Sequence, residues 1–234
     1  MNFELSEEQK MIQQSVERFV QENYDLPKRV EISSKDPGYS KEYWGSMAEL
    51  GWLGLPFEEK DGGFGGNQID TLVIMEQFGK GLVLEPFIAN VVLGGGAIQS
   101  GGSDELKKEM LPGLIEGSKQ MTLAYAEQQS RFDLEDVATS ARQEGDKFII
   151  NGQKSMVLNA ESADHIVVVT RTSGGQVDEE GITLFLVDSN AKGIELQNFP
   201  TVDGLRASEI TFDNVEVSSE RMIGELGKGF DILR

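Results

Sequence analysis

The amino-terminal stretch of the chain carries apolar residues at the spacing of an α-helix. A capping box of Ser6 and Gln9 precedes the apolar stripe, which runs to Tyr24. The apolar positions of the stripe are Ile12, Val16, Phe19 and Val20. Pro27 and the polar turn at 36–38 are expected to end this element, because both disfavour a continuing helix.

Three more stretches of the first half have helical spacing. They cover about residues 40–50, 72–79 and 103–110, and the first and the last of them open at a serine that can cap a helix. Pro112-Gly113 lies just past the third stretch and is expected to break the pattern. The first half of the chain is therefore predicted to be helical.

From Met121 onward the apolar residues come in short runs that are typical of β-strands. These runs are rich in β-branched and aromatic residues, and they cover 148–150, 155–158, 166–169, 182–187 and 210–212. Asn151-Gly152 follows the first run and predicts a two-residue hairpin. The polar, glycine-rich stretch 173–181 is expected to be a loop.

A helical half followed by a β half predicts an α+β protein of more than one domain. We expect an all-helical amino-terminal domain and then an antiparallel β-barrel or sandwich domain, joined near residues 112–121. The 234 residues are enough for two small domains or one large one, and for a real hydrophobic core.

The charge balance and the composition argue against several classes of function. The formal net charge of −19 disfavours a nucleic acid or an anionic membrane as partner, since such partners require a basic surface. The chain has no cysteine, which excludes disulfides and thiolate chemistry. No apolar run reaches the roughly 18 residues of a membrane span, and no targeting segment is visible. A cytoplasmic enzyme fits these features, and so does a processed organellar one.

Several common catalytic and nucleotide-binding motifs are missing. His165 is the sole histidine, and without a Gly-x-Ser-x-Gly turn nearby it is interpreted as a strand-end or surface residue. No group of histidines and carboxylates has metal-ligand spacing, so we predict no metal site. The glycines at 62–66 and 94–96 lack the context of a dinucleotide fingerprint. They are interpreted as structural, and those at 94–96 as permitting close packing.

An ordered series of short motifs resembles the acyl-CoA dehydrogenase family along the whole chain. In the helical half the motifs are FELSEEQ at 3–9, LGWLG at 50–54, GGFG at 62–65 and LPGL at 111–114. In the β half they are FIINGQK at 148–154, GLRAS at 204–208, FDNVEV at 212–217 and GKGF at 227–230. Each motif alone is weak, and their number and order together favour this family's fold.

The resemblance implies a domain division and a reaction. Residues 1–118 correspond to the family's amino-terminal helical domain, and residues 119–228 to its middle β-domain. Residues 229–234 correspond to the start of a carboxyl-terminal helical domain, whose remainder is absent from this sequence. The family binds FAD beside that domain, whose glutamate removes the α-proton of an acyl-CoA while hydride passes to the flavin. No catalytic residue is therefore expected within this chain.

Two segments correspond to those that contact the flavin in the family. They place six residues at the cofactor: Leu123, Tyr125, Ala126, Met156, Val157 and Leu158. Ala126 replaces the family's usual hydroxyl, and Met156–Leu158 replaces its Trp-Ile-Thr segment. Main-chain N–H groups survive any substitution, so the ring can still be held by main-chain hydrogen bonds. We expect FAD binding that is weakened but not abolished.

Arg131 and Phe132 stand where the family has a Gly-Ser pair beside the flavin and the substrate. We expect Phe132 to reshape the acyl-CoA pocket and Arg131 to meet an anionic group of the acyl-CoA or of a partner subunit. The alternative is that Arg131 is solvated or pairs with a carboxylate such as Asp133. This region, 124–139, is similar to the small subunit of pimeloyl-CoA dehydrogenase-type enzymes, which are hetero-oligomers of two related chains.

The resulting hypothesis is an FAD-dependent oxidoreductase chain that dehydrogenates an acyl-CoA during the degradation of fatty, dicarboxylic or sterol side-chain acids. The resemblance implies a homo- or hetero-oligomer that passes electrons to an electron-transfer flavoprotein. The alternative from another class is a flavin-free structural subunit that supports a catalytic partner. A general β-sandwich binding module does not explain the helical half.

Overall fold

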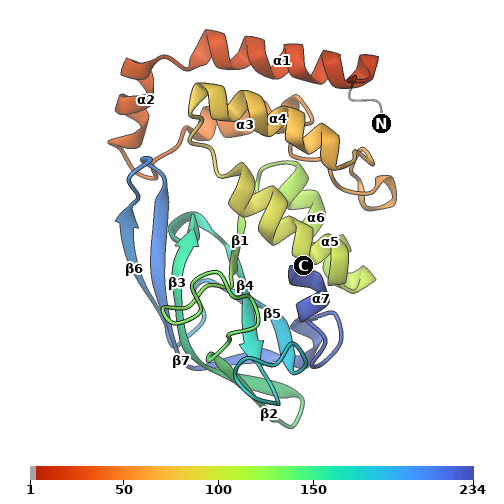
Figure 1. Ribbon diagram of the computed structural model, residues 1–234, viewed down its shortest axis with the longest axis vertical. Helices are drawn as coiled ribbons and strands as arrows, with labels where there is room; N and C mark the ends of the chain where they lie inside the picture. Colours follow the sequence, from red (N-terminus) through yellow and green to blue (C-terminus); the bar gives the residue numbers. More distant parts are fainter. Residues whose placement is uncertain (1–3) are drawn as a thin grey trace. The chain divides into compact units, whose positions relative to one another are not determined.

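The computed structural model describes residues 4–234, and Figure 1 shows its helices and strands. The chain divides into two compact units. The first holds the residues up to Glu85 together with Ile115–Gly117, and the second holds Pro86–Leu114 together with Ser118–Arg234. The domain boundaries at 118 and 228 that the sequence suggests remain predictions.

The described part of the first unit contains four α-helices and a short 3-10 turn. They are α1 (Glu7–Asn23), α2 (Leu26–Ser33), α3 (Lys41–Glu49), η1 (Glu59–Asp61) and α4 (Gln68–Gly81). The capping box of Ser6 and Gln9 is confirmed by reciprocal hydrogen bonds of 3.0 and 3.1 Å. α1 and α4 lie side by side (Figure 1), and Gln9 Nε2 donates to Asp70 at 2.9 Å between them.

The expected end of the first helical element is only partly right. α1 ends at Asn23, but the chain then begins α2 instead of a loop. Asp25 caps the new helix by accepting from Lys28 N at 2.7 Å. Pro27 lies in the first turn, where the N–H that proline lacks has no partner within a helix in any case. Pro27 therefore opens a helix rather than closing one.

The second unit begins with a π-helix, η2 (Ile88–Gly95), which continues as α5 (Gly96–Gly101) and is followed by α6 (Asp104–Ile115). The close packing expected at 94–96 is confirmed at Gly94, where a Cβ would lie 2.8 Å from Met121 Cγ, but it is wrong at Gly96, where a Cβ would meet nothing within 4 Å. The expected break at Pro112 is wrong, because α6 continues through it. Leu111 and Leu114 are fully buried, and their burial offsets the hydrogen bond that Pro112 cannot donate.

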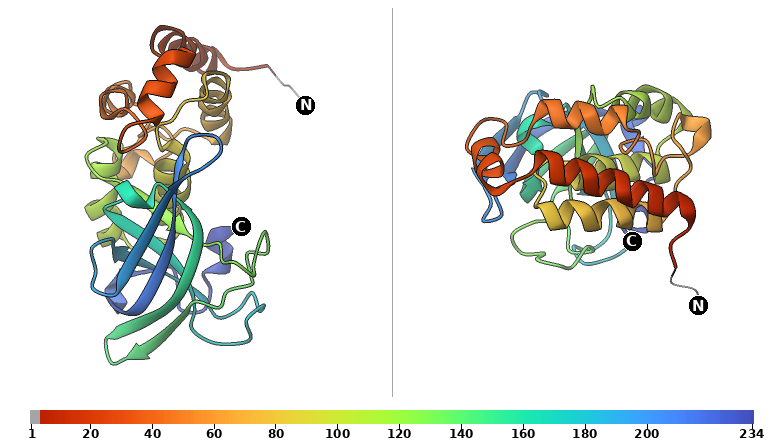
Figure 2. Two further views of the ribbon diagram at one scale, coloured as in Figure 1. Left: turned by 90° about the vertical axis from the view of Figure 1, so that its left-hand side faces the viewer. Right: turned by 90° about the horizontal axis from the view of Figure 1, so that it is seen from above.

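Eight strands form one sheet in the described part of the second unit. They are β1 (Met121–Ala124), β2 (Ser140–Glu144), β3 (Lys147–Leu158), β4 (His165–Arg171), β5 (Ile182–Asp188), β6 (Ile194–Pro200), β7 (Arg206–Ser218) and β8 (Met222–Ile223). The order across the sheet is β6-β7-β3-β2-β4-β5-β8, and β1 pairs in parallel with β4. The long strands β3 and β7 run antiparallel and curve together, as Figure 2 shows. A last short helix, α7 (Phe230–Leu233), follows β8.

Asn151-Gly152 does not form the hairpin that its sequence predicts. β3 runs through it, and the turn between β2 and β3 lies instead at Gly145-Asp146. Gly152 marks a register shift against β7, and a Cβ there would come within 2.6 Å of Thr139 Cα. The motif lies opposite a β-bulge of β7, in which Asp213 and Asn214 face Asn151 alone, and it forms no turn because β7 pairs with β3 on both sides of it.

The core of the second unit consists mainly of β-branched and aromatic side chains from the sheet. The rings of Phe148 and Phe185 pack within it, with their centroids 4.7 Å apart. A helical region followed by a β-domain confirms the fold class expected from the sequence. In the described part of the chain, no helix is both long and apolar enough to cross a membrane.

Candidate functional site

The two segments that the sequence places at a cofactor lie side by side in the second unit. β1 continues beyond Ala124 as residues 125–127, and the end of β3 runs beside it. Thr122 Oγ1 donates to the Leu158 carbonyl at 2.6 Å, and Ser155 N donates to the Ala126 carbonyl at 2.8 Å. These two hydrogen bonds bring together all six residues predicted to face the flavin: Leu123, Tyr125, Ala126, Met156, Val157 and Leu158.

β3 is irregular where it passes this stretch. Its register against β7 shifts between Lys154 and Val157, so the two residues between them face a single residue of β7. This arrangement is a β-bulge. Within it Met156 has a φ of 54°, a left-handed conformation that a residue with a Cβ disfavours. The bulge lets the Ser155 N–H donate to Ala126 of the neighbouring segment.

Lys154 and Glu127 form a buried ion pair next to the bulge. The side chains are 0% and 4% exposed, and Lys154 Nζ lies 2.7 Å from Glu127 Oε1. Lys154 Nζ also donates to the Tyr125 carbonyl at 3.0 Å. The Glu127 carboxylate accepts from the main-chain N–H groups of Ala138 and Thr139, at 2.9 and 3.0 Å. The pair therefore ties together three separate segments of the chain.

The pKa values of the pair follow from burial and from mutual attraction. Burial lowers the pKa of Lys154 to about 8, although the charge of Glu127 acts in the opposite direction. Burial tends to raise the pKa of Glu127, but the charge and hydrogen bonds of Lys154 outweigh it and the pKa lies below its ordinary value. Both groups are therefore charged at neutral pH.

Sequence reasoning assigned no role to this pair. In the sequence, Glu127 and Lys154 are noted only as members of segments that resemble the family. The available signal is local: Lys154 occupies a strand position that follows the apolar run 148–150 and precedes Val157 and Leu158. A lysine at such a position is seldom buried without a countercharge, so a carboxylate partner is the natural expectation.

The six side chains of the candidate site divide into buried and open ones. Leu123 and Val157 belong to the core, with 8% and 2% of their surface exposed. Tyr125 and Met156 are open, at 38% and 50%. The remaining two are half-buried and carry no hydroxyl or amide. An aromatic side chain, Tyr125, and a thioether, Met156, therefore lie open on adjacent segments.

Arg131 and Phe132 lie in the loop that follows Glu127. Ser130 Oγ accepts from the Glu127 N–H at 2.9 Å and so shapes the start of this loop. The Phe132 side chain is 96% exposed, and Arg131 is exposed with a φ of 50°. Among residues 4–234 the Arg131 guanidinium has no ion pair, so the alternative pairing with Asp133 is not formed, whereas the exposure of Arg131 fits the other alternative, a solvated side chain. Contact of these two residues with a substrate or partner stays a prediction.

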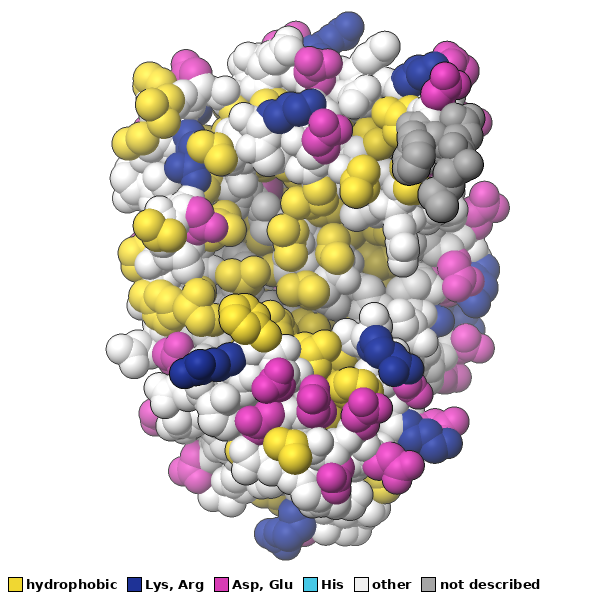
Figure 3. Space-filling view, in the orientation of Figure 1, with side chains coloured by type: hydrophobic (Ala, Val, Ile, Leu, Met, Phe, Trp, Pro, Cys, Tyr) yellow, Lys and Arg dark blue, Asp and Glu magenta, His cyan; other side chains and the backbone are white. Residues whose placement is uncertain are grey.

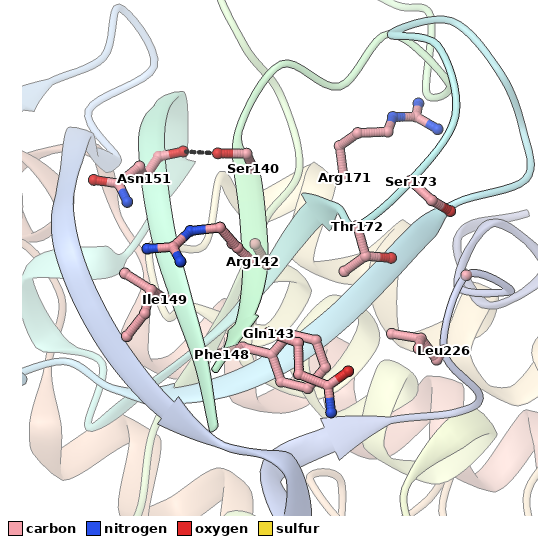
Figure 4. Close-up of a pocket in the computed structure, with 12 residues that line it drawn as sticks. Ser140, Arg142, Gln143, Phe148, Ile149, Asn151, Arg171, Thr172, Ser173 and Leu226 are labelled. Carbon is pink, nitrogen blue, oxygen red and sulfur yellow. Dashed lines mark hydrogen bonds between the residues drawn. The ribbon is translucent and has the colours of Figure 1, made fainter. Parts of the chain in front are cut away.

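A separate hollow lies between β2 and the loop after β4 (Figure 4). Its volume is about 590 Å³, and its walls include Arg142, Phe148 and Arg171. The Arg171 guanidinium is already engaged, because it donates to four main-chain carbonyls at 2.7–2.8 Å. These are the carbonyls of Glu135, Gln176, Asp178 and Glu180. Arg142 pairs with Glu144 at 2.5 Å. The arginines of this hollow therefore serve the protein itself.

The remaining candidate groups offer no second site. His165 begins β4, which confirms its strand-end position, and burial lowers its pKa. Within the described residues no group of three or more His, Asp or Glu side chains is placed to hold a metal ion. Figure 3 shows acidic side chains gathered on the visible face of the β-domain, with Lys and Arg scattered around them.

Comparison with known proteins agrees with this architecture. Residues 6–118 match the amino-terminal domain of acyl-CoA dehydrogenases, and residues 122–215 match the middle domain. The chain belongs to the acyl-CoA dehydrogenase family. The match confirms the resemblance that the motifs indicate, and it covers both the helical region and the sheet.

Individual acyl-CoA dehydrogenases and related proteins match over nearly the whole chain. A short-chain specific acyl-CoA dehydrogenase of Clostridium acetobutylicum is 31% identical over 99% of this chain and 62% of its own length. A subunit of a caffeyl-CoA reductase–Etf complex of Acetobacterium woodii is 28% identical over 96% of this chain and 60% of its own. The solved acyl-CoA dehydrogenase of Geobacillus kaustophilus has a TM-score of 0.86 at 27% identity, covering 100% of this chain and 62% of that one. The chain thus spans less than two thirds of the length of these relatives.

Proposed function

We propose that this chain is part of an FAD-dependent enzyme that introduces a double bond between the α- and β-carbons of an acyl-CoA thioester. Membership of the family supports the general reaction. The observation that carries the proposal is the pairing of the two predicted flavin segments. Hydrogen bonds from Thr122 to Leu158 and from Ser155 to Ala126 hold these segments together, with Tyr125 and Met156 open on them.

When bound, FAD supplies the acceptor for the hydride that leaves the β-carbon. The residues of this chain would hold and orient it. The main chain of Tyr125 and Ala126 and the segment Met156–Leu158 would bind the ring, and the open Met156 side chain would pack on it. Leu123 and Val157 lie in the core beneath these segments, so they would exclude water from that side.

The proton is removed by a residue outside this chain in our proposal. Glu127 is one carboxylate next to the flavin segments, but it is buried and already binds Lys154 and two main-chain N–H groups. Glu209 is another, and it already accepts from the Ser155 hydroxyl at 2.7 Å. The Glu127 carboxylate, held by its three partners, has a lowered pKa and is a poor general base. Its role is structural, and the relatives are long enough to supply a base elsewhere.

The partners follow from the reaction and from the relatives. An electron-transfer flavoprotein is the expected electron acceptor, and the Acetobacterium woodii relative, a subunit of a complex that contains Etf, supports it. We further propose an oligomer with an identical or related subunit. Arg131, whose guanidinium has no ion pair among the described residues, would meet an anionic group of the acyl-CoA or of that subunit, and the exposed Phe132 would border the substrate.

The rival function is a flavin-free structural subunit of a hetero-oligomeric acyl-CoA dehydrogenase. Ala126 and Leu158 favour it, because neither offers a side-chain hydrogen bond to a flavin. Purification of the full-length protein with its native partners separates the two. The proposal predicts a yellow complex whose flavin absorption bleaches with its acyl-CoA. A colourless complex that takes up no added FAD would establish the structural subunit instead.

A further inference from the structure

We propose that Lys154 and Glu127 are a positioning pair that sets the distance and alignment between the two flavin-facing segments. The inference rests on the proposed function, since it concerns the same site. Neither side chain is offered as a catalytic group, because both are buried and engaged with the protein. They act through the main chain of the residues that would touch the cofactor.

The contacts of Lys154 place it at the junction of the two segments. Lys154 immediately precedes the bulge that contains Ser155 and Met156. Its ammonium reaches across to the Tyr125 carbonyl at 3.0 Å, on the opposite segment. The adjacent Ser155 N–H bonds Ala126 at 2.8 Å. Two neighbouring residues of β3 thus hold two neighbouring residues of the other segment.

Glu127 fixes the other end of this arrangement. It directly follows Tyr125-Ala126, and its carboxylate anchors the Lys154 ammonium at 2.7 Å. Its bonds to the N–H groups of Ala138 and Thr139 attach the segment to the chain that leads into β2. Tyr125 and Ala126 are therefore held from both sides, and an apolar pair at these positions would hold neither the carbonyl nor the two N–H groups.

Burial makes a purely stabilising role a poor explanation. Taking both charges out of water is costly, and well-packed apolar replacements of a buried pair are often neutral or stabilising. A second ion pair that involves a lysine of β3 offers a contrast: Lys147 and Glu216 are 39% and 64% exposed and bridge β3 to β7 at 2.7 Å. That pair touches neither flavin segment. In the buried pair, by contrast, Lys154 donates to the main chain of Tyr125 in one flavin segment, and it directly precedes the bulge of the other segment.

The test compares full-length protein variants with native partners present. Lys154→Met and the double variant Glu127→Gln/Lys154→Met remove the pair, and the double variant leaves no uncompensated buried charge. Lys147→Met is the matched control, because it removes an exposed lysine from the same strand. The measurements are FAD content, the visible absorption and circular dichroism of the bound flavin, and kcat and KM for the acyl-CoA.

If the pair positions the segments, Lys154→Met and the double variant should both show an altered flavin spectrum. Their kcat should fall by up to about a hundredfold with a smaller change in KM, because misalignment of about an ångström has effects of that size. Lys147→Met should match the wild type in all of these measurements. If Lys154→Met does not fold, the double variant provides the same comparison. Wild-type flavin spectrum and kcat in a folded double variant would overturn the positioning role alone. A wild-type protein that binds no FAD would overturn both this inference and the proposed function.

Discussion

Glu127→Gln should destabilise the second unit more than Lys154→Met, although each substitution removes one half of the same ion pair. After Lys154→Met the carboxylate keeps three donors, the N–H groups of Ala138 and Thr139 and the side-chain amide of Gln129. After Glu127→Gln the Lys154 ammonium has no negatively charged partner, and it keeps its hydrogen bond to the Tyr125 carbonyl. The glutamine also turns an NH₂ group toward donors that need an acceptor.

The expected magnitudes follow from this asymmetry. Leaving the Lys154 charge uncompensated should cost about 3–5 kcal/mol, the scale for breaking a buried pair. Lys154→Met should cost roughly 1–3 kcal/mol, because the Glu127 carboxylate stays hydrogen-bonded. The exposed lysine of the control pair, Lys147, should contribute at most about 1 kcal/mol.

The deficit of Glu127→Gln should depend on pH in a definite direction. The pKa of Lys154 is about 8 in the folded chain, below its unfolded value of about 10.4, so the unfolded chain binds more protons between these values and stability rises with pH there. Removing Glu127 removes the charge that raises the pKa of Lys154, so this window opens at a lower pH. The variant therefore gains stability relative to the wild type as the pH rises, and its deficit should shrink up to about pH 8, the pKa of Lys154 in the folded wild type.

Urea unfolding followed by far-ultraviolet circular dichroism measures these differences. Tryptophan fluorescence is unsuitable, because Trp44 and Trp52 both lie in the first unit. The variants are compared at each pH with Lys147→Met as the control. Equal deficits for Glu127→Gln and Lys154→Met, or a Glu127→Gln deficit that grows as the pH rises, would refute the reasoning.

Three further predictions concern packing and ligand binding. Gly94→Ala should lower stability by about 1–3 kcal/mol, because its Cβ would lie 2.8 Å from Met121 Cγ; Gly96→Ala, with nothing within 4 Å, should be neutral or stabilising in the same thermal melts. The isolated chain should bind FAD more weakly than about 1 μM, since it spans 62% of a relative's length, and a tighter value by FAD fluorescence titration would contradict this. Replacing Arg131-Phe132 by Gly-Ser should not lower the chain's stability, because Phe132 is 96% exposed and glycine adopts the left-handed φ of 50° at position 131 without strain, yet it should strengthen FAD or acyl-CoA binding in the full-length protein. Unchanged calorimetric affinities for both ligands would remove these two residues from the site.

The division into a helical region and a sheet could be predicted from the sequence because apolar spacing is local information. A period near 3.6 up to Tyr24 and short β-branched runs after Met121 follow directly from how side chains point from a helix and a strand. Family motifs are local as well, so their order placed Tyr125-Ala126 and Met156–Leu158 at one candidate site before any contact between them was visible.

The errors arose where a neighbour in space overrides a local preference. Pro112 continues α6 because Leu111 and Leu114 are buried on either side of it. Asn151-Gly152 stays within β3, opposite a bulge of β7, because β7 pairs with β3 both before and after it. In each case the local signal was real, but packing or strand pairing contributed more free energy than the turn or break that the signal predicts.

The ion pair of Lys154 and Glu127 depended entirely on the tertiary structure. The two residues are 27 positions apart, and neither has a partner that sequence spacing would suggest. The sequence specified the hydrophobic pattern, the family and the two segments of the site, because each of these is encoded within a short stretch. Whether a lysine in β3 is exposed or buried, and which carboxylate compensates it, was decided by the path of β1 and its extension beside the β3 bulge. Burial and charge compensation depend on neighbours in space, and only the folded chain brings those neighbours together.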